Sequence, residues 1–184
     1  FDDRTATLFQ GNDSIRAGKF TFSFAVPKDL HYSDASALVN LYAVNTERTE
    51  IANGWCDKFV ANGSDVADND SIGPSIFCYL NSPSFVNGGK VNTTPYFVAN
   101  IKDQDGLNAS GSGIGHDMQL TIDGDMNKTY SLNDYFTFDF GSYTSGSTCY
   151  SLPELTPGKH RLQFRAWDVL SNSSTVQLDF TVAK

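Results

Sequence analysis

The sequence is poor in methionine, cysteine and basic residues, and it contains no long hydrophobic run. Its 184 residues include 2 Met and 3 Cys, and 13 Lys and Arg stand against 21 Asp and Glu, which gives a formal net charge of −8. Phosphate backbones and anionic bilayers attract clustered Lys and Arg, so we expect no nucleic-acid partner. No stretch approaches the roughly 18 apolar residues of a membrane-spanning helix, so we expect no direct membrane insertion.

The cysteines and histidines form no recognisable catalytic or zinc motif. Cys56, Cys78 and Cys149 are odd in number and lack CxxC spacing, so three free thiols are favoured, with one disulfide as the alternative. The three histidines, His31, His116 and His160, lie in no HxH or HExxH pattern. No GxSxG elbow, P-loop or GxGxxG is present either. We therefore expect this chain not to be an enzyme by itself.

Aromatic residues in alternating patterns dominate what the sequence does contain. Its 14 Phe and 8 Tyr, together with many turn residues, favour strands over helices. Alternation predicts a strand over residues 20–26, with Phe20, Phe22 and Phe24 on one face. Further strands are expected at Thr7–Gln10, Ala37–Val44, Asp57–Ala61, Ile76–Leu80, 97–101, 118–122, Thr129–Leu132, 162–166 and 176–182. No helix longer than a turn or two is expected.

This strand spacing predicts an all-β chain of immunoglobulin-like sandwich type. Seven or so short strands after residue 67 suit one complete module, because a sandwich of this type needs about 100 residues. The strands before residue 67 are too few for a second, so we assign residues 1–66 to the C-terminal part of a β-sandwich-like domain and residues 67–184 to an immunoglobulin-like β-sandwich domain. The polar stretch around residues 62–70 marks the boundary. The start at Phe1, without Met or signal sequence, suggests an excised piece.

A calcium loop is one hypothesis for the segment after the 97–101 strand. Asp103, Asp105 and Asn108 alternate around Gly106, and Asp117 could supply a further oxygen. Position twelve from Asp103 is Ile114, not the bidentate Glu of an EF-hand. The alternative, which we favour, is an Asx turn with no bound cofactor.

Trp167 is the aromatic that alternation places outside the core. Because Leu162, Phe164 and Ala166 occupy the buried face of their strand, Trp167 points to the opposite one. An exposed Trp suits a sugar or protein contact; the alternative, which we favour, is packing under a neighbouring loop or the other domain.

Several segments, in order along the chain, resemble one known family. They are Gly88–Pro95, Asp103–Asn108, Gly113-Ile114-Gly115-His116-Asp117, Pro157–His160 and Ala166-Trp167-Asp168-Val169. Together they are similar to the region that follows the peptidase domain in type IX secretion sortases, which are gingipain-like cysteine peptidases.

The resemblance implies a large parent protein at the cell surface, on the extracellular face of the outer membrane. Such a parent would remove C-terminal sorting signals from secreted cargo and aid attachment of that cargo to the surface. The implied partners of this region are the upstream peptidase domain of the same chain and attachment-complex proteins such as PorV. In that family the catalytic Cys and His lie upstream, so the resemblance assigns no catalytic residue here.

A structural role fits the glycine-rich loop within this resemblance. Gly113 and Gly115 permit positive φ angles and a tight path, and His116 and Asp117 could tie that path to the Asp103–Asn108 turn. With Asp168 at the end of the neighbouring strand, we interpret these residues as a loop brace. The expected function is a non-catalytic structural or docking module, and the alternative is a carbohydrate- or protein-binding surface module.

Overall fold

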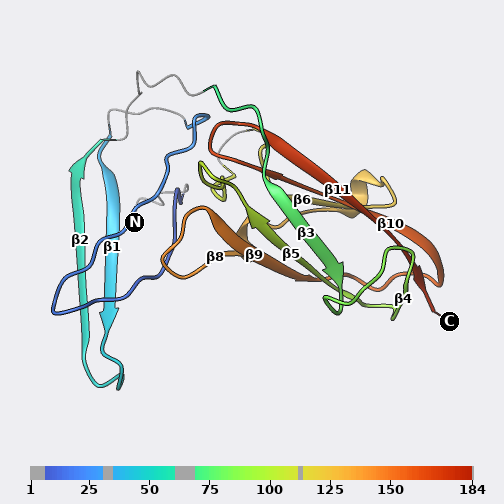
Figure 1. Cartoon of the computed structure of the whole chain (residues 1–184), viewed down its shortest axis with the longest axis horizontal. Coiled ribbons are helices and arrows are strands. Elements are labelled where there is room, and N and C mark those ends of the chain that lie inside the picture. The colour runs from blue at the N-terminus through green and yellow to red at the C-terminus, as the bar shows by residue number, and fades with distance from the viewer. Residues whose placement is uncertain (1–6, 31–34, 61–68, 112–113, 184) are drawn as a thin grey trace. The chain divides into compact units, whose positions relative to one another are not determined.

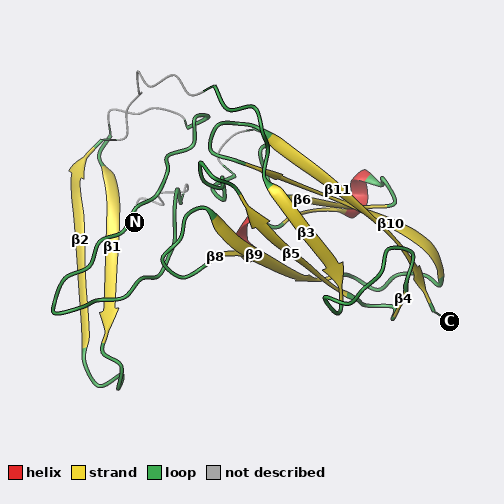
Figure 2. Ribbon diagram, viewed as in Figure 1, coloured by secondary structure: helices red, strands yellow, loops and turns green. Residues whose placement is uncertain are grey.

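The computed structural model describes residues 7–30, 35–60, 69–111 and 114–183, and nearly all regular structure in it is β-strand (Figure 2). The two helical elements of the described chain are single 3₁₀ turns, η1 (Met126–Lys128) and η2 (Asn133–Tyr135). The prediction of an all-β fold is confirmed. By its internal contacts the chain divides into two units: one comprises residues 1–30 and 69–184, and the other residues 31–68.

The larger unit is a sandwich of two sheets (Figure 1). One sheet has the order β4-β11-β10-β6-β7, and the other β3-β5-β9-β8. The first is made of β4 (Lys90–Val91), β11 (Ser173–Val182), β10 (Gly158–Trp167), β6 (Gln119–Ile122) and β7 (Thr129–Ser131). The second is made of β3 (Ser75–Leu80), β5 (Tyr96–Lys102), β9 (Ser145–Ser151) and β8 (Phe136–Phe138). All the pairings are antiparallel except β11 with β4.

The core lies between these sheets, because alternate residues of each strand point inward. The Phe97 ring of β5 and the Phe164 ring of β10 are both fully buried, with centroids 5.1 Å apart. The other fully buried positions on the facing strands were likewise predicted by alternation: Ala99, Ile101, Leu120, Ile122, Leu162 and Ala166. Burying a large aromatic contributes about 2–3 kcal/mol, so these residues are the main stabilising element of the sandwich.

The smaller unit contains a two-stranded antiparallel hairpin, β1 (Ala37–Val44) and β2 (Ile51–Phe59). β1 has the predicted bounds, whereas the predicted strand Asp57–Ala61 is displaced: β2 begins at Ile51 and ends at Phe59. Residues 51–56 belong to the strand because they pair with β1. Their local residue pattern alone did not predict this strand.

The strands predicted at Thr7–Gln10 and over residues 20–26 are wrong as regular strands. Both segments belong to the larger unit, but neither forms a ladder with another strand in the described chain. Alternation specifies which side chains share a face, but a strand also requires a neighbour that takes up its backbone N–H and C=O groups. The predicted boundary between residues 66 and 67 falls in 61–68, outside the described residues, and stays a prediction.

Candidate functional site

A cluster of polar side chains from distant segments lies at one end of the sandwich, where β5 and β10 both end. Asp29, from the segment before β1, reaches Asn108 of the β5–β6 connection and His116 further along it. Asn108 is fully buried, and its Nδ2 donates to Asp29 Oδ1 at 3.2 Å. The other carboxylate oxygen of Asp29 bonds Nδ1 of His116. From here on, the brace means Asp29, Asn108 and His116 together with the Trp167 ring that contacts His116, and the predicted brace means the set inferred from the sequence.

Trp167 fixes the position of the imidazole in the brace. The His116 ring lies 4.1 Å from the Trp167 ring, centroid to centroid, and the guanidinium carbon of Arg165 lies 5.3 Å from the same indole. Arg165 in turn donates to the carbonyl of Gly115 at 3.0 Å. The indole is therefore half-covered by a loop and a cation, which is the packing alternative considered for Trp167.

A second buried carboxylate completes this end of the sandwich. Asp168 is fully buried directly after β10, and its Oδ1 accepts from the backbone N–H of Leu170 at 2.9 Å and of Asn172 at 2.7 Å. Its Oδ2 accepts from Nδ2 of Asn172 at 2.8 Å. Three hydrogen bonds to one buried carboxylate hold the β10–β11 turn closed.

The Asp103–Asn108 segment forms a turn rather than an open ring of oxygens. The backbone N–H of Asp105 donates to Asp103 Oδ1 at 2.9 Å, an Asx turn, and Oδ1 of Asn108 accepts from Ser110. Burial raises the pKa of Asp103, and the Asp168 charge adds to this against the lowering by the Asp105 N–H. The described residues contain no group of three or more His, Cys, Asp or Glu side chains that could hold a metal. The calcium site that would include Asp117 stays a prediction.

The glycines of the predicted brace have the expected backbone in part. Gly115 has a φ angle of +81°. Gly111, just before the predicted brace, has a φ angle of +59°, and a Cβ on it would lie 2.8 Å from Asp117 Oδ1. Gly113 lies outside the described residues, as does His31. The sequence did not predict Asp29, because it lies 79 residues from Asn108 and 87 from His116 and no local pattern marks it.

The second histidine–carboxylate pair lies at the opposite end of β10. His160 Nδ1 bonds Asp123 Oδ2 at 2.8 Å, and its Nε2 donates to the carbonyl of Thr156 at 2.7 Å. Burial lowers the pKa of His160, but these two hydrogen bonds outweigh it and leave the pKa raised. Burial likewise raises the pKa of Asp123, while bonds from Arg161 N–H and His160 bring it below its usual range. Both ring nitrogens of His160 make hydrogen bonds, so the pair holds the start of β10 to Asp123 and to the segment before β10.

The thiols are not paired with each other or with an imidazole in the described chain. Cys56, Cys78 and Cys149 are all free, as favoured from the sequence. Burial raises the pKa of Cys78 to about 11, which leaves this thiol protonated near neutrality.

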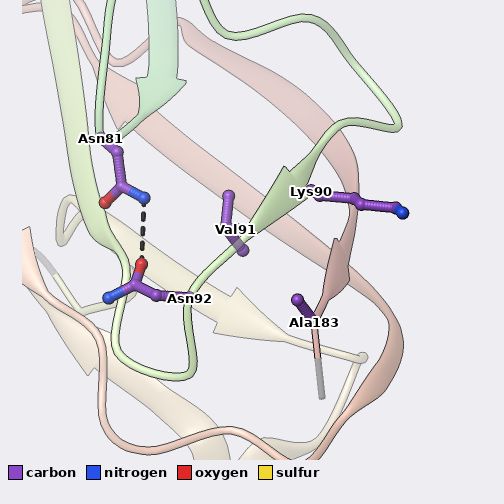
Figure 3. A pocket seen from close by; sticks show the side chains of 5 residues that line it. All are labelled: Asn81, Lys90, Val91, Asn92 and Ala183. Atoms are coloured by element: carbon purple, nitrogen blue, oxygen red, sulfur yellow. Dashed lines mark hydrogen bonds between the residues drawn. The ribbon is translucent and has the colours of Figure 1, made fainter.

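A shallow pocket of about 530 Å³ opens at the same end of the sandwich as His160 (Figure 3). Asn81, Lys90, Val91, Asn92 and Ala183 line it. Asn81 Nδ2 donates to Asn92 Oδ1 at 3.0 Å across its wall, and Asn81 Oδ1 accepts from the backbone of Tyr96. The asparagines are thus engaged in holding strand ends together.

The fold defines the larger unit as a two-sheet β-sandwich, and the hydrogen bonds of the brace connect loops at one end of it. Among solved structures, it is similar to a dimeric latent form of PorU from Porphyromonas gingivalis, with 36% identity over 88% of this chain and a TM-score of 0.62. The chain spans about 15% of the length of that protein. It is therefore related to one region of PorU.

The remaining comparisons add no identity. An endo-β-1,4-mannanase from Thermotoga petrophila is matched at 9% identity and a TM-score of 0.38, over 60% of this chain and 20% of its own. No protein-family profile and no curated protein matches the chain.

Proposed function

We propose that this chain is a non-catalytic structural and docking region of a larger PorU-like cysteine peptidase, which processes the C-terminal sorting signals of secreted cargo. The observation that carries the proposal is the 36% identity to PorU across 88% of the chain. The proposed location is the cell envelope, at the extracellular face of the outer membrane. No helix in the described residues is long and apolar enough to cross a membrane.

The brace supports a structural role for the sandwich. Its histidine, carboxylate and amide groups bond one another, and the imidazole packs against the Trp167 indole in a tilted arrangement. Groups satisfied in this way stabilise loop positions. The proposed partners are the peptidase domain of the same polypeptide and envelope proteins of the attachment complex such as PorV.

The test compares peptidase activity with complex formation. Purified chain is assayed for cleavage of a peptide carrying a type IX sorting signal, before and after iodoacetamide treatment. Separately, the tagged chain is mixed with a PorU-like peptidase domain and with PorV. We expect no cleavage and co-elution with at least one partner; thiol-dependent cleavage, or elution of the chain alone from both mixtures, would refute the proposal.

Carbohydrate binding is the second candidate, and one surface favours it. Cross-strand register places Asn40 opposite Trp55 and Tyr42 opposite Asn53, so these four share one face of the β1–β2 hairpin. Tyr42 and Trp55 are 68% and 67% exposed. Two exposed aromatics beside two amides are a suitable surface for sugar stacking and hydrogen bonding. Glycan-array binding that is lost in Trp55→Ala but retained in Trp167→Phe would support it, and silence on the array would remove it.

A further inference from the structure

The segment between Phe9 and Val26, which we call the N-terminal arm, is held to the sandwich at both ends (Figure 1). At its start, the Phe9 ring packs on Phe138 with centroids 4.9 Å apart, and Asn12 O accepts from the Gly141 N–H at 2.8 Å. Just beyond its end, Lys28 N–H donates to the carbonyl of Val169 at 2.7 Å, next to the brace. The arm is therefore positioned before any partner binds.

Within the arm the chain reverses at a tight turn. Arg16 and Lys19 exchange backbone hydrogen bonds of 2.9 and 3.0 Å. Ala17 and Gly18 between them have φ angles of +48° and +74°, the signs that a type I′ hairpin turn requires. Past the turn, residues 20–26 continue without pairing to another strand in the described chain.

Residues 20–26 nevertheless have the side-chain geometry of a strand. The Phe20 and Phe22 rings are stacked 6.1 Å apart and the Phe22 and Phe24 rings 6.2 Å apart, with interplanar angles of 13° and 9°. That spacing is close to the roughly 6.7 Å that separates same-face residues two apart in an extended strand. Phe20 and Phe22 are 45% and 41% exposed, so the outer part of this aromatic row is uncovered.

The backbone of the same residues also lacks hydrogen-bond partners in the part of the chain that the structure describes. Within the described ranges, no backbone N–H or C=O group of residues 20–26 makes a hydrogen bond to another residue. Such a segment is a template for an added strand, in which main-chain bonds supply affinity and alternate side chains supply specificity.

Charge indicates which strand would fit. Residues 15–28 include Arg16, Lys19 and Lys28 and no Asp or Glu, in a chain of net charge −8. Two copies of this segment would bring like charges together, which disfavours pairing of the chain with itself. A strand that carries carboxylates at its ends would instead be attracted.

We propose that residues 20–26 are a docking site for an acidic, amphipathic β-strand of a partner protein. The partner strand pairs with the free backbone of residues 20–26 and places apolar side chains beside Phe20, Phe22 and Phe24. Its terminal carboxylates lie near Lys19 and Lys28. This inference is independent of the proposed peptidase context.

The test uses the whole chain and a blocked nine-residue peptide, Glu-Val-Thr-Val-Thr-Val-Thr-Val-Glu. Its matched control has Lys in place of both Glu residues. Binding is measured by calorimetry, and the site is located by amide hydrogen exchange. We expect about tenfold tighter binding of the acidic peptide, consistent with two exposed ion pairs, together with new protection at residues 20–26.

Three variants sharpen the outcome. Ser23→Pro removes a backbone donor and should abolish binding, whereas Ser23→Ala keeps the donor and should bind normally. Lys19→Glu combined with Lys28→Glu should invert the preference toward the basic peptide. Lack of binding by either peptide would overturn the proposal, as would equal affinity for both. Concentration-dependent dimers with residues 20–26 protected in the absence of peptide would replace the acidic strand by a second copy of the chain.

Discussion

Replacement of Asp168 by Ala should be among the most destabilising changes outside the apolar core. The fully buried carboxylate accepts three hydrogen bonds, two from the backbone of Leu170 and Asn172 and one from the Asn172 side chain. Bonds to a charged group contribute about 1.5–3 kcal/mol each, but removing the carboxylate also removes the cost of its burial. The expected net loss is about 3 kcal/mol, or roughly 10 °C in the melting temperature for a unit of this size.

Asp168→Asn separates the hydrogen-bond geometry from the charge. Asparagine retains one acceptor oxygen for the two backbone N–H groups but directs an amide N–H₂ at the Asn172 amide. Its expected loss is about 1–2 kcal/mol, so stability should fall in the order Asp, Asn, Ala.

Urea unfolding followed by tryptophan fluorescence measures these differences, because Trp167 adjoins the substituted position. Asp134→Ala is the control, since Asp134 is exposed and should change stability by less than about 0.5 kcal/mol. The reasoning fails if Asp168→Ala stays within 1 kcal/mol of the unsubstituted protein, or if the Asn variant is less stable than the Ala variant.

Three other predictions concern the remaining polar groups. His116→Ala should cost about 1–2 kcal/mol and speed amide exchange near Asp29, and an unchanged melting temperature would contradict the brace. The pair of His160 and Asp123 should stabilise the fold only between two pH limits. Because the pKa of His160 is raised, the stabilisation is lost as the pH rises through that pKa. Because the pKa of Asp123 is lowered, the stabilisation is also lost as the pH falls through that pKa. His160→Gln should remove the alkaline decline in a series of melting curves. Cys78, with a pKa of about 11, should react with a disulfide reagent at pH 8 at least tenfold more slowly than the exposed Cys149, measured in single-cysteine variants.

Much of the sandwich was determined by local sequence. Period-two alternation placed Phe97, Ala99 and Ile101 on the buried face of one strand and Leu162 and Phe164 on that of another, and all five are fully buried. The physical reason is that the two faces of a strand meet different environments and alternate residues share a face, so the order of apolar and polar residues indicates which side chains are buried. The same pattern placed Trp167 on the outer face.

Tertiary structure decided the pairings that connect distant segments. The contact of Asp29 with Asn108 and His116 spans more than 75 residues and follows from how the chain packs at the end of β10, which no spacing encodes. The N-terminal arm is the converse case, in which a local pattern was present but tertiary pairing was not. Residues 20–26 have the alternation of a strand, yet they form no ladder in the described chain, because a strand's hydrogen bonds belong to two segments and the sequence of one specifies only its half.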